Sequence, residues 1–104
     1  MVKREGQGGT ETLANERVKV KRPKLYKVLL LNDDYTTMDF VVMVLESIFR
    51  KSPNEAVQIM LQVHNKGHGV CGVFTKEIAE TKVAMVHKTA QDRGFPLRCS
   101  MEEE

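Results

Sequence analysis

A small group of polar side chains could together bind a positively charged group. Asn32, Asp33 and Asp34 directly follow the apolar run Val28–Leu31, and His64 lies on an apolar helical stripe further along the chain. Alternate side chains of an extended backbone share a face, so we expect Asn32 and Asp34 to point one way and Asp33 the other. With a neutral imidazole, His64 joins Asn32 and Asp34 to offer three acceptors for the three protons of one ammonium group.

Plainer interpretations of these residues remain open from the sequence alone. Asn-Asp pairs are common in ordinary turns, and a histidine on an apolar stripe is more often a core residue that bonds a local carbonyl. His64-x-x-x-His68 has the one-turn spacing of a zinc pair. However, Gly67 interrupts the helix there and neither Cys71 nor Cys99 lies at ligand spacing. We therefore expect no metal and no other cofactor.

The motifs of common catalytic sites are missing from the sequence. Asp33, Asp34 and His64 could serve acid–base catalysis only beside an activated nucleophile and an oxyanion pocket. The chain has no Gly-x-Ser-x-Gly, no phosphate loop and no reactive-cysteine environment. We expect a binding protein rather than an enzyme. An apolar wall near the ammonium receptor could come from flexible and branched side chains, namely Met38, Val41, Met60 and Val63.

The first half of the chain is predicted to begin with a strand and a helix joined by a short loop. A buried strand is predicted over Lys24–Leu31 and a helix over Thr37–Arg50. Thr36-x-x-Asp39 is typical of a helix N-cap with an acid in the first turn. The connecting loop Asn32–Tyr35 is therefore short, and we expect it to be ordered.

A second helix is predicted to begin at Ser52-Pro53-Asn54-Glu55, which combines an N-cap, a first-turn proline and a Glu at the third position. The helix is expected to stop at Gly67. Its apolar stripe is predicted to contain Val57, Met60, Leu61 and His64.

The remaining elements are a strand, a helix and a strand. Gly69–Phe74 predicts a short strand whose two glycines indicate a bulge or close backbone packing. Thr75 is expected to cap a third helix that ends before Gly94, and Pro96–Met101 closes the chain as a strand. The third helix should bury Ala79, Val83, Val86 and Ala90. The order β-α-α-β-α-β predicts an α+β fold, with a small antiparallel sheet on one side and helices on the other.

Composition indicates one globular domain preceded by a tail. The 104 residues carry 16 basic and 14 acidic side chains, and 41% of them are hydrophobic. Residues 1–22 are charged and poor in apolar side chains, so we expect a flexible tail there and a single domain over 23–104. A basic arm for nucleic acid is the alternative, weakened by interspersed Glu residues and by the lack of aromatics. Without an export signal, Cys71 and Cys99 are expected to be small buried side chains in a reducing cytoplasm.

Four blocks of sequence, in order and at matching intervals, resemble the ClpS adaptors of the bacterial N-end rule pathway. The resemblance covers roughly residues 24–101 and rests on Leu31–Val41 (LNDDYTTMDFV), Val63-His64, Gly69–Thr75 (GVCGVFT) and Ala79–Val83 (AETKV). It implies a split α/β sandwich, a three-stranded antiparallel sheet packed against three helices, similar to the C-terminal domain of the ribosomal stalk protein. It also implies binding of proteins that begin with Leu, Phe, Tyr or Trp.

The resemblance assigns roles to particular residues. Asn32, Asp34 and His64 would hold the α-amino group, with Asp33 close by. The side-chain pocket would be lined by Thr36, Met38, Val41, Met60, Val63 and Leu97. The residue at position 38 would act as a gate that excludes β-branched first residues. Many members have Pro where this chain has Thr37, a difference from which little change is expected.

The resemblance also implies a partner. The protein would hand its substrates to the N-terminal domain of a Clp AAA+ ATPase, ClpA or ClpC, for degradation by ClpP. Glu77 and Lys82 match positions that contact this domain, although a solvated helix face is the alternative. No nucleic acid or membrane partner is expected, and the protein should be a monomer. The competing interpretation is a non-catalytic regulatory domain that binds peptides or nucleic acid.

Overall fold

The central strand of the fold is β1 (Leu25–Leu31), which pairs with an antiparallel neighbour on each side. The computed structural model describes residues 22–104, and the tail expected over residues 1–22 lies outside them except for its last residue. The strand order is β2-β1-β3, with β2 at His68–Thr75 and β3 at Arg98–Glu103. The helices are α2 (Met38–Ser47), α3 (Pro53–Lys66) and α4 (Lys76–Arg93), so the predicted order β-α-α-β-α-β is confirmed.

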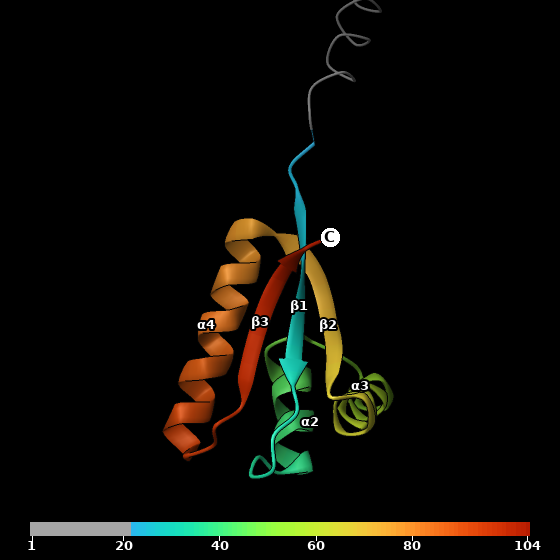
Figure 1. Ribbon diagram of the computed structural model, residues 1–104, viewed down its shortest axis with the longest axis vertical. Helices are drawn as coiled ribbons and strands as arrows, with labels where there is room; N and C mark the ends of the chain where they lie inside the picture. Colours follow the sequence, from blue (N-terminus) through green and yellow to red (C-terminus); the bar gives the residue numbers. More distant parts are fainter. Residues whose placement is uncertain (1–21) are drawn as a thin grey trace, which may run out of the picture.

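The helices cover one side of the sheet and one of its ends. α4 packs against all three strands, and α3 packs against β2 and α2. α2 and α3 lie at the end of the sheet where β1 finishes (Figure 1). A single buried cluster joins the layers and includes Val28 and Leu30 of β1 with Val44 and Leu45 of α2. None of the helices in the described part of the chain combines the length and the apolar character needed to cross a bilayer.

The two glycines of β2 behave as the sequence predicts. The register shifts between the pairs Val28–Gly72 and Leu29–Val70, which leaves Cys71 as a bulge. At Gly69 a Cβ atom would lie 2.9 Å from Cγ2 of Val63, so only glycine lets α3 approach the strand this closely.

The start and end of α2 differ from the prediction. Thr37, not Thr36, is the N-cap, and its hydroxyl accepts a hydrogen bond from the Phe40 N–H at 3.1 Å. The hydroxyl of Thr36 instead donates to Asp33. The helix ends at Ser47 rather than at Arg50, because Arg50 adopts a left-handed conformation with φ of 56° that turns the chain toward α3.

The start of α3 is predicted correctly, but its buried face is not. Ser52 and Glu55 form the expected reciprocal capping box, and Gly67 ends the helix in a left-handed conformation. The residues that α3 buries are Ala56, Met60 and Val63, while Val57, Leu61 and His64 are exposed. The true stripe is rotated by one residue because α3 meets β2 and α2 along the face that includes Val63. His64 is therefore not a core histidine.

The last helix and strand follow the predicted pattern with two changes. α4 buries Ala79, Val86 and Ala90 as expected, while Val83 is half-buried. Thr75 occupies the N-cap position of α4, but its side chain makes no capping hydrogen bond. β3 begins two residues later than predicted and runs on to Glu103. Its acidic end lies against lysines of the β1 region, with Lys27–Glu102 and Lys24–Glu103 ion pairs of 3.9 and 3.4 Å.

Both cysteines are free and buried, as predicted. Burial raises the pKa of the Cys71 thiol and of the Cys99 thiol to about 12, so both remain protonated at neutral pH. They fill the core as small apolar side chains.

Candidate functional site

The loop between β1 and α2 is tied to the end of α3. The N–H of Asn32 donates to the carbonyl of Gly67 at 2.9 Å, and Gly67 is the C-cap of α3. His64 lies in the last turn of that helix, and both Asn32 and His64 are exposed. One backbone hydrogen bond thus brings the start of the loop next to the helical turn that carries the imidazole. The loop and α3 lie at the same end of the sheet (Figure 1).

Asp33 organises this loop through both of its carboxylate oxygens. Oδ1 accepts from the N–H groups of Tyr35 and Thr36 at 2.8 and 2.7 Å. Oδ2 accepts from the Thr36 hydroxyl at 2.7 Å. Asp33 is half-buried while its neighbours Asn32 and Asp34 are exposed, and the chain bends over Asp34–Thr36, where it folds around the Asp33 carboxylate. Since the loop itself uses the Asp33 carboxylate, the groups left facing solvent are those of Asn32 and Asp34.

The hydrogen bonds also set the charge state of Asp33. Partial burial alone would raise the pKa of the Asp33 carboxyl, but the bonds from Thr36 and Tyr35 outweigh it and lower the pKa below the ordinary 3.8. The ionised form therefore stabilises the loop at any pH above 3.8. That stabilisation is lost as the pH falls below this value through the lowered pKa of the folded protein.

Replacing Asp33 separates this supporting role from ligand contact. We expect Asp33→Ala to weaken binding of an amine ligand about three- to tenfold, because a loop that loses hydrogen bonds no longer holds its neighbours in place. Asp33→Asn keeps one acceptor oxygen for the Tyr35 and Thr36 amides and should cost less. Titration calorimetry measures both affinities, and amide exchange at Tyr35 and Thr36 reports the loop. Unchanged exchange in Asp33→Ala would contradict the supporting role.

The structure brings four of the six expected pocket residues into one apolar cluster. Val41 comes from α2, Met60 and Val63 from α3, and Leu97 from the segment before β3; each is at least 90% buried. Met38 is not part of this cluster. It is the first residue of α2 and is 44% exposed. Thr36 is half-buried, and its hydroxyl donates a hydrogen bond to Asp33 within the loop.

On α4, the two residues matched to a partner contact differ from each other. Glu77 is exposed in the first turn. Lys82 is half-buried, and its Nζ donates to the carbonyl of Ile48 at 2.7 Å, next to the end of α2. The ammonium also lies about 6 Å from the ring centroids of Phe49 and Phe74. A purely solvated position is therefore wrong for Lys82, whose charge stabilises the C-terminus of α2.

Lys82 should consequently contribute to stability. We expect Lys82→Met, which keeps the aliphatic stem beside the rings, to lower the free energy of unfolding by about 1–2 kcal/mol, since one charge-assisted hydrogen bond is lost at a half-exposed site. The control is Lys88→Met on the same helix. Within residues 22–104, Lys88 forms an exposed ion pair with Asp92, 3.4 Å long, for which about 0.5 kcal/mol or less is expected. Urea denaturation giving equal values for both variants would contradict this role.

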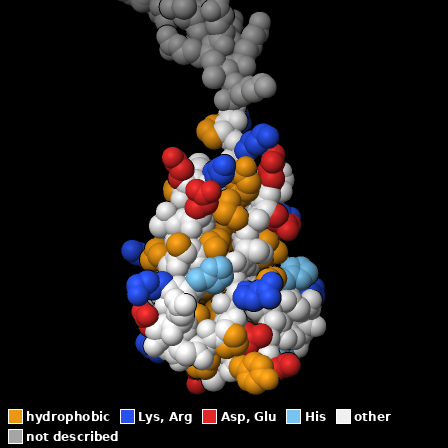
Figure 2. Space-filling model, turned by 60° about the vertical axis from the view of Figure 1, so that its left-hand side comes forward, with side chains coloured by type: hydrophobic (Ala, Val, Ile, Leu, Met, Phe, Trp, Pro, Cys, Tyr) orange, Lys and Arg blue, Asp and Glu red, His pale blue; other side chains and the backbone are white. Residues whose placement is uncertain are grey.

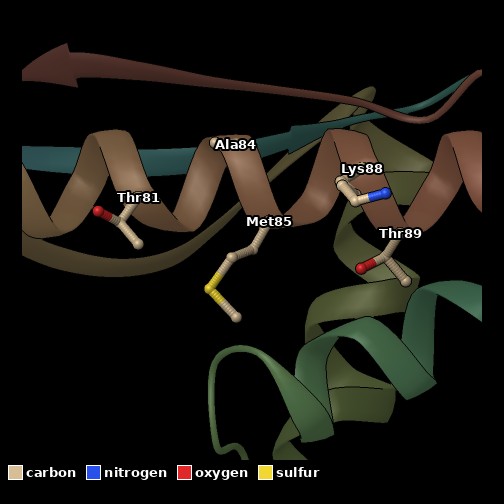
Figure 3. A pocket seen from close by; sticks show the side chains of 5 residues that line it. All are labelled: Thr81, Ala84, Met85, Lys88 and Thr89. Carbon is tan, nitrogen blue, oxygen red and sulfur yellow. The ribbon is translucent and has the colours of Figure 1, made fainter.

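Sequence reasoning missed a shallow hollow on the outer side of α4. It has a volume of about 380 Å³ and is lined by Thr81, Ala84, Met85, Lys88 and Thr89. Figure 3 shows the side chains of Thr81, Met85 and Thr89 pointing from α4 away from the strands. Apolar side chains also form a broken stripe along one face of the molecule, with charged groups on both sides near the start of the described chain (Figure 2).

The chain matches proteins of known class along most of its length. The sequence profile of the family described as "ATP-dependent Clp protease adaptor protein ClpS" matches residues 21–100. The ATP-dependent Clp protease adapter protein ClpS of Oleidesulfovibrio alaskensis is 68% identical over 84 residues, 81% of each chain. The protein of the same name from Nitratidesulfovibrio vulgaris is 55% identical over 96 residues, 92% of this chain and 96% of that one.

A solved structure agrees with the fold as well as with the sequence. Agrobacterium tumefaciens ClpS2 bound to L-phenylalaninamide superposes with a TM-score of 0.78 and 44% identity, covering 80% of this chain and 100% of that chain. The expected fold, a three-stranded antiparallel sheet with three helices, is the one that both proteins share. From its profile, its relatives and its fold, the chain belongs to the ClpS family of ATP-dependent Clp protease adaptor proteins.

Proposed function

We propose that this protein captures the free α-amino group and the first side chain of proteins that begin with Leu, Phe, Tyr or Trp. It delivers them to the N-terminal domain of a Clp AAA+ ATPase, ClpA or ClpC, for degradation by ClpP. The observation that carries this proposal is the tie between Asn32 and the C-cap of α3, which joins an exposed amide–carboxylate loop to the turn of His64. The relative bound to L-phenylalaninamide supports the ligand class.

In the proposed complex the ammonium group is held by Asn32, Asp34 and His64. The loop bonds of Asp33 keep Asn32 and Asp34 in place. The first side chain enters beside the apolar cluster, with Met38 as the gate at its edge. The remaining wall residues are Thr36, Val41, Met60, Val63 and Leu97. Capture of an N-terminal amine is a recurring recognition mode.

The energies require both halves of the ligand. A hydrogen bond to a charged group is worth about 1.5–3 kcal/mol, and burial of a Leu or Phe side chain adds roughly 1.5–3 kcal/mol. Association costs about 4–15 kcal/mol. Two or three such bonds and one buried side chain therefore give modest affinity, and neither half suffices alone. The protein responds only to a free amine and a large apolar side chain together.

Several finer points belong to the same proposal. The protein acts by binding, without catalysis and without a cofactor, as a cytoplasmic monomer made of a tail over residues 1–22 and an adaptor domain over 23–104. Glu77 and Lys82 contact the ATPase. Because Lys82 also supports α2, Glu77 is the cleaner test: Glu77→Ala should weaken ATPase binding and leave peptide binding unchanged.

An array of peptides that differ only in the first residue tests the proposal. We expect binding of peptides that begin with Leu, Phe, Tyr and Trp, and rejection of those that begin with Ile or Val, because the gate at Met38 excludes β-branched side chains. Free L-phenylalaninamide should compete with every bound peptide. Binding that is independent of the first residue, or that resists this competition, would favour the regulatory domain that binds internal segments or nucleic acid.

A further inference from the structure

His87, which has no role in the proposed function, makes a hydrogen bond to β3, the strand that directly follows the proposed pocket residue Leu97. Its Nε2 accepts from the N–H of Cys99 at 3.0 Å, which connects the middle of α4 to β3. In the sheet formed by residues 22–104, β3 is an edge strand that pairs with β1. Such a strand needs partners from outside the sheet for the N–H groups on its free side, and His87 supplies one for Cys99.

This bond lies two residues from Leu97, a wall residue of the proposed pocket. Residues 95–97 connect α4 to β3 without regular structure. At the near end, the N–H of Phe95 donates to the carbonyl of Ala90 at 2.9 Å, and the Phe95 ring packs on Phe40 with centroids 4.7 Å apart. At the far end, the Cys99 bond to His87 holds the strand against α4.

Leu97 therefore lies between two residues whose backbone N–H groups are bonded to α4, Phe95 on one side and Cys99 on the other. Its preceding residue, Pro96, has no N–H to donate, so the backbone around it has few bonds of its own. Leu97 is 3% exposed and belongs to the same buried cluster as Val41, Met60 and Val63. A shift at Phe95 or Cys99 would move its side chain against these three.

We propose that His87 is a positioning residue for the side-chain pocket: through Cys99 it fixes Leu97 and so sets which first residues fit. The inference rests on the proposed function, because it assigns a source of specificity to the same site. The bond requires the neutral imidazole with a free lone pair on Nε2. In this proposal His87 is not a ligand contact; it acts through its hydrogen bond to the backbone of β3.

Two substitutions isolate this hydrogen bond. His87→Ala removes the acceptor, whereas His87→Gln places an amide oxygen at a similar reach and should restore it. Lys88→Ala is the matched control, because among the described residues this neighbouring side chain forms an exposed ion pair with Asp92. Calorimetry with L-phenylalaninamide, L-leucinamide and L-tryptophanamide on the full chain gives the affinities, and thermal melting gives the stability of each variant.

We expect His87→Ala to weaken L-phenylalaninamide binding about three- to tenfold, the change that corresponds to one hydrogen bond, and to alter the ratio of the L-leucinamide and L-tryptophanamide affinities. His87→Gln and Lys88→Ala should stay close to the starting protein. Unchanged affinities and ratio in His87→Ala would overturn the proposal. So would an equal loss in His87→Gln, or a loss of all three affinities by one common factor, since these indicate a general structural role.

The methyl resonances of Leu97 provide a readout that needs no ligand. His87→Ala should shift them and His87→Gln should not; resonances that stay in place in His87→Ala overturn the proposal. Should the starting protein bind none of the three amides, the proposed function fails, while the Leu97 resonances still decide whether His87 positions the segment.

Discussion

Acetylation of the α-amino group of L-phenylalaninamide is expected to abolish its binding. The acetylated nitrogen is uncharged and keeps a single proton, so at most one of three proposed hydrogen bonds survives. Each lost bond to the charged group is worth about 1.5–3 kcal/mol, and the loss of two lowers the affinity by at least about a hundredfold. The added acetyl group must also fit between the loop of Asn32 and Asp34 and the last turn of α3, which a backbone hydrogen bond holds together.

Fluorescence anisotropy of a labelled peptide that begins with Phe, displaced by each amide, measures this effect. The control is L-phenylalaninamide methylated on its carboxamide nitrogen, which carries a similar added group at the other end and should bind nearly as before. Equal displacement by the acetylated and the free amine would reject capture of the ammonium group.

Replacement of Asp34 by Ala should give the second largest effect. Asp34 is exposed, and none of the hydrogen bonds or ion pairs among residues 22–104 uses its carboxylate. Its removal should therefore leave the stability within about 0.5 kcal/mol of the original value. Loss of one charge-assisted bond to the ammonium predicts a drop in affinity of about ten- to a hundredfold.

The comparison with neighbouring variants makes this prediction specific. Asp34→Asn keeps an acceptor oxygen but no charge and should fall between the original protein and Asp34→Ala. Asp92→Ala, a change at an exposed carboxylate on α4, should have no effect on binding. The loss in Asp34→Ala should exceed that in Asp33→Ala, because Asp33 is engaged within the loop. The reverse order would show that the two aspartates have the opposite roles.

Local signals account for the parts of the fold that were predicted correctly. The capping box of Ser52 and Glu55 and the helix ends at the left-handed Gly67 and Gly94 each depend on a few consecutive residues. The errors occur where contacts between elements determine which face of a helix is buried or where it ends. The buried face of α3 is set by its contact with β2, and α2 ends early because the chain turns at Arg50. Single-residue preferences do not encode either of these choices.

The site shows the same division. Asn32 and Asp34 are exposed on either side of a half-buried Asp33, although the chain bends over Asp34–Thr36 instead of staying extended as expected. The contacts that hold the surroundings could not be predicted: Asn32 to Gly67, Lys82 to Ile48 and His87 to Cys99 join residues far apart in the sequence. The first is a bond between two backbone groups, and the other two join a side chain to one backbone group; the sequence carries no local pattern for any of them.

A crystal structure of the protein with L-phenylalaninamide tests the central claim most directly. We predict that the ligand nitrogen lies within about 3 Å of the Asn32 side-chain oxygen, an Asp34 carboxylate oxygen and a His64 ring nitrogen at once. The phenyl ring should lie beside Met38 and Leu97. A ligand nitrogen that contacts none of these three groups, or a ring bound elsewhere on the molecule, would contradict the account.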